Sequence, residues 1–282
     1  MLSFPNCKIN LGLNILRKRE DGFHDLETIF YPVYKLHDAL EILAAPGINT
    51  PDGVDVSSID FQLSGLVVDG DTANNLCIKA YQLLKKDFPE LPAVRLHLHK
   101  AIPMGAGLGG GSADGAFTLK LLNEKFHLQI EAPDLIDYAL QLGSDCPFFI
   151  VNKSCFARGR GEIIKEIDLD LSGYSIVLIN PGIHVSTGWA FGHIIPKQPE
   201  NSLEQLIAQP IERWRQLIEN DFETAVANAH PIISTIKSTL YEKGALYASM
   251  SGSGSTVYGI FLSTQMPSAK LFPEFLELHL PL

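Results

Sequence analysis

A glycine-rich segment in the first half of the chain constrains its fold more than any other feature. Residues 102–117 read IPMGAGLGGGSADGAF, and six of these sixteen residues are glycine. Such density weakens any helix or strand that contains it, because ordering glycine costs the most backbone entropy. The strand-like segment 93–100 precedes this loop and a helix-like pattern follows it from about Ser112. This order gathers backbone N–H groups at the positive end of a helix, which is a geometry that binds phosphate.

Other readings of the glycine loop are open. Gly105, Gly107 and Gly110 match the dinucleotide-binding pattern G-x-G-x-x-G, but no clear βαβ unit surrounds them. A Walker loop requires lysine immediately before the serine, and Ser112 follows Gly111 instead. A glycine-rich hairpin without a ligand is the remaining structural reading. We favour a different kind of nucleotide-phosphate loop.

Composition limits the possible partners. The chain has 282 residues, of which 46% are hydrophobic, so it can bury the core of one large domain or of two ordinary ones. Its formal charge of -10 argues against nucleic-acid binding, which needs a basic face. The cysteines, at positions 7, 77, 146 and 155, lack CxxC or zinc-ligand spacing, so we expect reduced thiols. No signal peptide or membrane-length apolar run is visible, and we expect a soluble, cytoplasmic protein of undetermined oligomeric state.

The apolar patterns predict an irregular series of strands and helices. Strands are expected over residues 7–16, 28–36, 40–45, 93–100, 147–151, 175–182, 245–250 and 256–262. Helices are expected over residues 73–88, from about 112, over 132–143 and between about 201 and 243. Thr72 is the expected N-cap of the first helix, and Gly143 is the expected C-cap of the third. The polar, turn-rich segment 152–174 suggests a domain boundary, and the pattern predicts the α+β class.

Three segments together resemble one family. PMGAGLGGGSADGA resembles the signature P-x-x-x-G-L-G-[GS]-S-[SA] of the GHMP small-molecule kinases, which include galactokinase, homoserine, mevalonate and phosphomevalonate kinases. PNCKINLGLNI (5–15) and SMSGSGSTVYGIF (249–261) resemble the N-terminal and C-terminal motifs of that family, in the same order. The resemblance implies a ribosomal S5 domain 2-like N-terminal domain over 1–155 and a ferredoxin-like C-terminal domain over 156–282, with the active site between them.

Further segments resemble the branch of this family that acts on a cytidine-diphosphate alcohol. They are KINLGLNILRKREDGFH (8–24), the triple glycine before Ser112 and LGSDCPFF (142–149). The resemblance implies transfer of the γ-phosphate of ATP, with magnesium, to a hydroxyl of a small-molecule cytidine-diphosphate substrate. Two alternatives are a GHMP kinase of the homoserine or mevalonate type and a nucleotide-binding sensor without catalysis.

The resemblance assigns catalytic roles to Lys8 and Asp145. Lys8 would lie beside the acceptor hydroxyl and offset charge that develops during transfer, and Asn10, on the same strand face, would hold the substrate. Asp145 would accept the hydroxyl proton as catalytic base. On the residues alone, Lys8 also reads as a solvated edge charge and Asp145 as an aspartate that bonds its own turn.

The base pocket departs from the family pattern at one position. Phe23 stands where the family usually has tyrosine, so stacking on cytosine is kept but a hydroxyl is lost. His24 would read the edge of the base, and Phe191 would cover its other face. Phe191 as a core aromatic, and residues 21–22 as a simple turn, are the structural alternatives.

The resemblance also assigns the nucleotide site. The residues expected to bind ATP around the loop are Pro103, Met104, Gly105, Ala106, Gly107, Leu108, Gly109, Gly110, Gly111, Ser112 and Ala113. Asn75 is expected in the adenine pocket, and Gly252 and Gly254 near the substrate, unless their segment is only a tight turn. A serine that binds magnesium in related kinases aligns with Gly111, so the magnesium ligands stay unassigned and Ser112 is read as a helix cap.

Overall fold

The structure, a computed structural model, describes residues 1–45, 59–68 and 71–282. It divides into two compact units that are interleaved along the sequence. The first unit comprises residues 1–7, 36–104 and 109–152, and the second comprises residues 8–35, 105–108 and 153–282. The chain therefore passes between the units at the N-terminal motif and again within the glycine loop. The last crossing between the units follows Asn152. The domain boundary expected after residue 155 stays a prediction.

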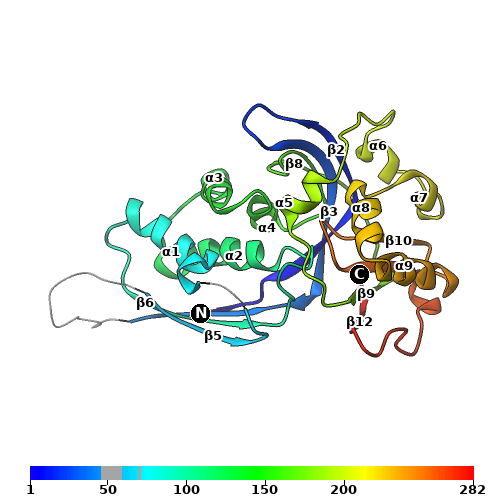
Figure 1. Cartoon of the computed structure of the whole chain (residues 1–282). Coiled ribbons are helices and arrows are strands. Elements are labelled where there is room, and N and C mark those ends of the chain that lie inside the picture. The colour runs from blue at the N-terminus through cyan, green and yellow to red at the C-terminus, as the bar shows by residue number, and fades with distance from the viewer. Residues whose placement is uncertain (46–58, 69–70) are drawn as a thin grey trace. The chain divides into compact units, whose positions relative to one another are not determined.

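The first unit is a mixed sheet covered on one face by helices. Its strands are ordered β1 (Leu2–Ser3), β4 (Ala39–Ala44), β6 (Val94–Lys100) and β5 (Ile59–Gly65). β4 runs antiparallel to β1 and β6, whereas β5 runs parallel to β6. The covering helices, seen above the sheet in Figure 1, are α1 (Leu76–Asp87), α2 (Gly110–Phe126), α3 (Ala132–Leu142) and α4 (Cys146–Val151). β6 alternates buried and more exposed side chains, as expected for a strand with one covered face.

Close packing between α1 and α2 explains one glycine in the phosphate helix. A Cβ atom at Gly115 would lie 2.9 Å from the Cβ of Leu76 at the start of α1. An exposed helical glycine costs about 1 kcal/mol relative to alanine, because it adds backbone entropy to the unfolded chain. At Gly115 the absence of a side chain lets α1 and α2 approach closely. The contact between the two helices offsets the low helix propensity of glycine.

Three local predictions in the first unit are wrong. Thr72 does not cap α1: Thr72–Asn74 forms the 3₁₀ turn η1, and the side chain of Asn75 caps the helix by accepting the Cys77 N–H. α2 begins at Gly110, so Ser112 is its third residue and not its cap. Residues 147–151 belong to helix α4 and not to a strand, because a short apolar run has no periodicity that separates the two.

The second unit contains two sheets. One has the order β2 (Asn6–Lys18), β3 (His24–His37), β7 (Cys155–Gly159) and β8 (Ile163–Glu166), and the first residues of β2 and the last of β3 belong to the first unit. The other has the order β10 (Tyr247–Met250), β11 (Val257–Leu262), β9 (Tyr174–Asn180) and β12 (Leu276–Pro281), antiparallel throughout. The remaining helical segments are α5 (Thr187–Gly192), α6 (Leu203–Ile207), α7 (Ile211–Leu217), α8 (Asp221–Ala229), α9 (Ile232–Glu242) and η2 (Ser263–Gln265).

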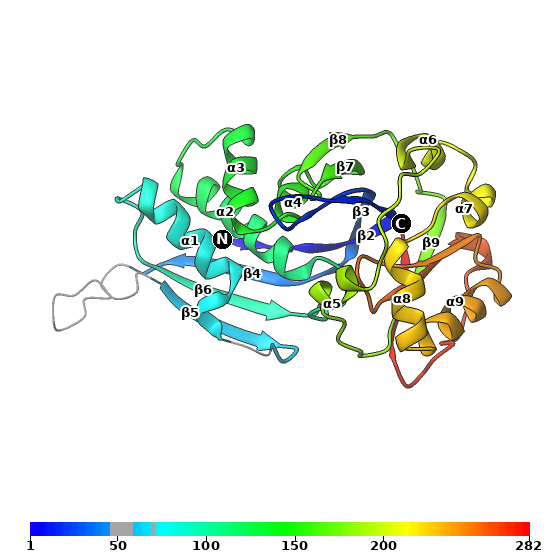
Figure 2. The same ribbon diagram turned by 45° about the horizontal axis from the view of Figure 1, so that its top comes forward.

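One hydrophobic core joins both sheets of the second unit to its helices. Ile233, Ile236 and Leu240, spaced at three or four residues, are buried along α9 against Val257 and Phe261 of β11. α8 and α9 lie side by side over this sheet in Figure 2. The same cluster includes Leu13 and Ile15 of β2 and Leu26 of β3. β2 is thus anchored on one face by this core, which fixes the direction of its other side chains.

The α+β class is confirmed, and most of the expected elements are present. The strands around residues 7–16, 28–36, 40–45, 93–100, 175–182, 245–250 and 256–262 are confirmed, as is the helix that ends at Gly143. β5 and β12 were not predicted, and β7 and β8 occupy the segment read as turn-rich. In the described part of the chain, no helix combines the length and the hydropathy that a membrane span requires.

Candidate active site

The second unit brings Lys8 and Asn10 together with the glycine loop. Both side chains are buried, with exposed fractions of 3% and 2%. Lys8 Nζ donates to Asn10 Oδ1 at 2.6 Å and to the carbonyl oxygen of Gly107 at 3.2 Å. Asn10 Nδ2 in turn donates to Thr28 Oγ1 at 2.9 Å on the neighbouring strand β3. Lys8 is therefore not a solvated edge charge, and its ammonium is held at a carbonyl of the loop.

The C-terminal glycine motif meets the same point through Ser251. Ser251 Oγ accepts the Asn10 N–H at 3.2 Å and donates to the Gly107 carbonyl oxygen at 2.8 Å. Gly107 has φ +77°, and a Cβ atom there would lie 1.9 Å from the carbonyl oxygen of Ser251. Only glycine fits this position, for conformational and for steric reasons. Gly252 and Gly254 of this motif are predicted site residues, whereas Ser251 is not.

Asn220 is a second polar residue at this motif that was not predicted from the sequence. It is buried, and its Nδ2 donates to the carbonyl oxygens of Met250 and Gly252 at 2.7 and 2.8 Å. These bonds hold the start of the glycine motif in place. Gly254, with φ +96°, has no room for a Cβ, which would lie 2.7 Å from the sulfur of Met250. No short-range sequence signal links Asn220 to a motif about thirty residues further on.

His24, expected to read the edge of the base, and Phe191, expected to cover one of its faces, lie in contact in the second unit. Their rings are stacked with centroids 4.6 Å apart and an interplanar angle of 16°. His24 opens β3, Phe191 lies on α5, and the rings of Phe191 and Phe222 pack at 89° with centroids 4.9 Å apart. Burial and the nearby Lys18 charge lower the pKa of His24, which favours the neutral ring. A neutral imidazole carries one donor and one acceptor, as reading a base edge requires.

Phe23 lies in a different environment from His24 and Phe191. Its ring is half exposed and lies beneath the guanidinium of Arg160, at 4.5 Å from the ring centroid. Its N–H donates to Asp21 Oδ1 at 3.1 Å, which makes residues 21–23 a tight turn. Arg160 also lies 3.8 Å from Glu162, measured from Nε to Oε1. Phe23 is thus held by a cation–π contact at the tip of the β2–β3 connection.

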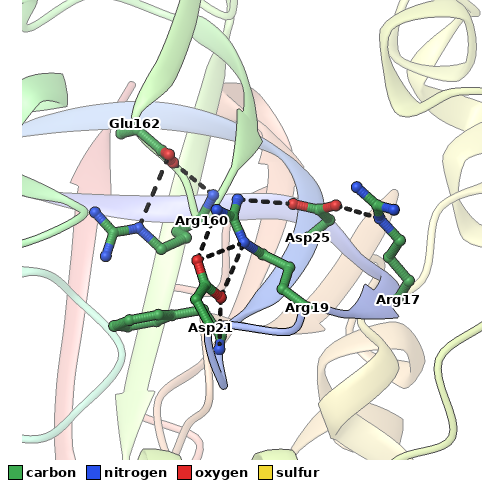
Figure 3. Close-up of polar contacts among 7 residues, drawn as sticks. Arg17, Arg19, Asp21, Asp25, Arg160 and Glu162 are labelled. Carbon is green, nitrogen blue, oxygen red and sulfur yellow. Dashed lines mark hydrogen bonds and ion pairs between the residues drawn. The ribbon is translucent and has the colours of Figure 1, made fainter.

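Figure 3 shows the charged network around this turn. Arg19 bonds both Asp21 and Asp25, and Arg17 bonds Asp25 from the other side. Hydrogen bonds from these arginines lower the pKa of Asp21 and of Asp25, and desolvation opposes this effect. The network is solvent-exposed, so it orders the turn more than it stabilises the fold.

The first unit carries the start of the phosphate helix. Gly109, with φ +71°, occupies the N-cap of α2 and offers no side-chain cap. The space next to Gly111 is open. Apart from its chain neighbours and the backbone of its own helix, no heavy atom of the described residues would lie within 4 Å of a Cβ at this position. The first turn of a 17-residue helix therefore presents N–H groups and a positive dipole end at an uncrowded position. Pro103 and Met104 lie before the loop in this unit.

Asp145 lies in the first unit directly before Cys146, whose side chain interacts with Ser112. Asp145 occupies the N-cap position of α4 but its side chain does not cap that helix. The adjacent Cys146 thiol shares a hydrogen bond with the Ser112 side chain. Burial raises the pKa of this thiol to about 12, the bond to Ser112 opposes the rise and the Asp145 charge adds to it. The segment that follows Asp145 is thus close to the first turn of α2.

The predicted residues are distributed over both units. Lys8, Asn10, residues 105–108, Gly252 and Gly254 lie in the second unit with the His24–Phe191 stack, whereas residues 109–113, Asn75 and Asp145 lie in the first. The pairing of Lys8 with Asp145 stays a prediction. In residues 1–45, 59–68 and 71–282, no three His, Cys, Asp or Glu side chains are grouped so that they could hold a metal ion.

Two sequence models of one family match the chain. The GHMP kinases N terminal domain matches residues 75–153, and the GHMP kinases C terminal domain matches residues 202–271. The first match spans α1 to α4 with the glycine loop, and the second spans α6 to α9 with the SGSGS segment.

Relatives and solved structures agree with these matches. The 4-diphosphocytidyl-2-C-methyl-D-erythritol kinase of Bacteroides fragilis is 51% identical over 93% of this chain and 92% of its own length. The same kinase from Porphyromonas gingivalis is 40% identical over 93% and 92%. A crystal structure of 4-(cytidine 5'-diphospho)-2C-methyl-D-erythritol kinase superposes with a TM-score of 0.73 at 29% identity, covering 92% of this chain and 89% of the other. Homoserine kinase from Cytophaga hutchinsonii, at a TM-score of 0.61 and 16% identity, covers 92% and 86% and shares the fold. The chain belongs to the GHMP kinases, a family of ATP-dependent small-molecule kinases, and groups among them with the 4-diphosphocytidyl-2-C-methyl-D-erythritol kinases.

Proposed function

We propose that this chain transfers the γ-phosphate of ATP to the 2-hydroxyl of 4-diphosphocytidyl-2-C-methyl-D-erythritol, in the non-mevalonate route to isoprenoid precursors. One observation carries the proposal: the buried ammonium of Lys8 donates hydrogen bonds both to the Asn10 side chain and to the Gly107 carbonyl oxygen of the glycine loop. The stacked pair of His24 and Phe191 in the same unit favours a substrate with a flat base.

In this proposal Lys8 stabilises charge on the transferring phosphoryl group. A loose phosphoryl-transfer transition state spreads negative charge over the equatorial oxygens, and positioned cations stabilise it most where water is excluded. Lys8 is buried and points to a loop carbonyl, so its direction is already fixed. Asn10 accepts from that ammonium, and its amide is tied to Thr28, so it orients Lys8 and offers a polar contact to the substrate.

Asp145 acts in the proposal on the acceptor hydroxyl. Its carboxylate would accept a hydrogen bond from the 2-hydroxyl and take its proton as the bond to phosphorus forms. Because little proton abstraction is needed early in a loose transition state, orientation of the hydroxyl is the larger part of this role. The interaction of Cys146, the residue after Asp145, with Ser112 supports the assignment, since it places this segment near the helix end that would bind the phosphates.

The nucleotide would be held mainly by backbone groups. The N–H groups at the first turn of α2 and the glycines of positive φ, at 105, 107 and 109, suit the approach of phosphate oxygens. Asn75 would border the adenine while its side-chain oxygen caps α1. Magnesium would accompany the ATP phosphates, and its ligands in this chain stay unassigned. When bound, magnesium would neutralise charge on the β- and γ-phosphates.

The cytosine base would enter between the rings of His24 and Phe191, so that His24 would cover the face of the base expected for Phe23. The two rings now stack on each other, so a base can enter only if they separate to about twice a stacking distance. Phe23, under Arg160, would line the outer side of this pocket without supplying a hydroxyl. We place the reaction in the cytoplasm, where ATP is abundant and where the buried free cysteines of this chain would remain reduced.

The direct test of substrate choice is ADP release from the purified protein with magnesium–ATP. Parallel reactions contain 4-diphosphocytidyl-2-C-methyl-D-erythritol, homoserine, mevalonate or no acceptor. The proposal predicts turnover with the cytidine compound alone. Turnover with another alcohol would replace the substrate but keep the kinase, and ATP binding without turnover on any acceptor would favour a sensor.

A further inference from the structure

We propose that Asp38 is a positioning residue for the ATP loop, and that it joins the two ends of this loop through Lys100. The inference rests on the proposed function only in that it takes ATP as the ligand of the loop. Both ends of the loop, residues 101–104 and 109–113, belong to the first unit together with Asp38 and Lys100. None of these contacts involves a residue to which the resemblance assigns catalysis.

Asp38 holds the first end of the loop by its backbone. It lies between β3 and β4 and is fully buried. Its Oδ1 accepts the N–H groups of Ala101 and Ile102 at 2.6 and 2.9 Å. Two consecutive N–H groups bonded to one carboxylate oxygen fix the direction in which the chain leaves β6. This is the direction in which the glycine loop begins.

Lys100 extends the same hold to the second end of the loop. It is the last residue of β6, and its buried Nζ donates to Asp38 Oδ2 and to Asp114 Oδ2, the latter at 2.7 Å. Asp114 lies on α2, four residues after Gly110. A Cβ at Gly110 would lie 2.8 Å from Ile102 Cγ2 and 3.3 Å from Lys100 Nζ. The first turn of α2 therefore lies directly on the residues that Asp38 holds.

The charges of this cluster balance when one carboxyl carries a proton. Burial raises the pKa of Asp114 to about 8, the Lys100 charge opposes the rise and the Asp38 carboxylate adds to it. The raised pKa favours the protonated form of the Asp114 carboxyl near neutral pH, which lowers the negative charge of the cluster. The Cys77 thiol, which faces the same cluster from α1, stays neutral because burial raises its pKa. A cluster with less negative charge is easier to bury and repels less the phosphates that the loop would bind.

The cluster of Asp38, Lys100 and Asp114, called the clamp below, is needed because of the glycines between the two ends of the loop. Gly105, Gly107 and Gly109 all have positive φ and give the loop backbone freedom that other residues would not. Affinity for phosphate falls if the loop must be ordered at the moment of binding, because the ligand then supplies that ordering free energy. A buried cluster that fixes both ends orders the loop before ATP arrives.

The test compares Asp38→Asn with Glu277→Gln as a matched control. Glu277 is equally buried, accepts the consecutive N–H groups of Leu271 and Phe272, and contacts His279 Nε2 at 2.6 Å. It lies in β12 of the second unit and in no proposed site. Both variants lose one charged oxygen and keep one acceptor, so both should lower the thermal unfolding midpoint.

The two variants should differ in nucleotide binding. Asp38→Asn should raise KM for ATP, and Kd for magnesium–ATP measured by equilibrium dialysis, about tenfold, with KM for the cytidine compound within about twofold. Glu277→Gln should leave all three constants unchanged. If Asp38→Asn lowers the unfolding midpoint but leaves ATP binding as in the wild type, Asp38 is merely structural and the proposal is overturned.

A second variant covers the case in which Asp38→Asn does not fold. Asp114→Ala keeps the ion pair between Asp38 and Lys100 and removes only the hydrogen bond from Lys100 to α2. This variant should fold and bind magnesium–ATP about fivefold more weakly. Unchanged binding would overturn the clamp. If the wild type binds ATP but phosphorylates no cytidine compound, the proposed substrate fails while the dialysis still decides the clamp. Absence of ATP binding by the wild type would overturn both.

Discussion

Lys8 shows how one residue can be read in two ways until its contacts are known. As a lysine on an alternating strand, it fits a solvated edge charge as well as an active-site cation. In the structure it is buried, and Asn10 and Gly107 take its hydrogen bonds. The hydrogen bond from Ser251 to Gly107 could not be predicted from the sequence, because the two residues are 144 positions apart. Long-range hydrogen bonds of this kind have no periodic signal.

Replacement of Asp145 tests the division between chemistry and nucleotide binding. Asp145→Ala removes the group that would orient the acceptor hydroxyl and take its proton, so we expect kcat to fall by a factor on the order of 10²–10⁴. Kd for magnesium–ATP, measured by equilibrium dialysis, should stay close to that of the wild type. Parallel loss of turnover, ATP binding and thermal stability would mean that Asp145 is a structural residue.

Phe191 and Phe23 are expected to differ in their effect on the cytidine substrate. Phe191→Ala removes one face of the base pocket, and base–aromatic stacking of about 1–3 kcal/mol corresponds to a KM increase of about 5- to 150-fold. Phe23→Tyr should change the same KM by less than about tenfold, because Phe23 stacks with Arg160 and not with His24. Steady-state kinetics at saturating ATP measures both, and a larger effect at Phe23 than at Phe191 would contradict this view of the pocket.

At the scale of the element, the sequence predicted strongly periodic segments and missed those defined by distant contacts. α9 and β6 carry clear periods of 3.6 and 2, and both are present. The run at 147–151 is apolar on every side, and only Pro147 near its start and the packing of Phe148 and Phe149 make it the helix α4. β12 follows a segment rich in proline and pairs with β9 nearly a hundred residues earlier. Such pairing leaves no local signature.

Two glycines of α2 give opposite predictions for the stability of that helix. Gly111→Ala meets open space and should stabilise the protein by about 0.5–1 kcal/mol, because alanine loses less backbone entropy. Gly115→Ala gains the same propensity, but its Cβ would lie 2.9 Å from that of Leu76, so we expect a net loss of about 1–3 kcal/mol. Urea unfolding of both variants measures the difference. Equal effects would mean that the α1–α2 contact relaxes without cost.

At the scale of the whole molecule, one chain builds two units by crossing between them several times. β2 starts in the first unit and continues in the second, whereas the glycine loop enters the second unit at Gly105 and returns to the first at Gly109. The order of the motifs can be read from the sequence. The sequence does not indicate which of the two units each segment joins. Hydrophobic patterns report which face of an element is buried but not which core receives it.

The stability of the protein should depend on pH through Asp114. Its pKa is raised to about 8 in the folded state and lies near 3.9 in an unfolded chain, so the folded state binds more protons between these values. The contribution of Asp114 to the free energy of unfolding should therefore fall as pH rises from about 4 to about 8, and level off above. Asp114→Asn cannot titrate and should gain stability relative to the wild type as pH rises through this window. Unfolding midpoints at pH 5, 7 and 9 measure this, and a constant difference between the two proteins would contradict it.

The phosphorus NMR spectrum of the completed reaction tests the proposed phosphoryl transfer most directly. With magnesium–ATP and 4-diphosphocytidyl-2-C-methyl-D-erythritol, we predict ADP and one new phosphomonoester resonance in equal amounts. The two resonances of the cytidine diphosphate should be retained, because only the 2-hydroxyl is modified. Lys8→Met protein under the same conditions should give neither product on the same time scale. ADP with inorganic phosphate and no phosphomonoester, or loss of the diphosphate resonances, would contradict the account.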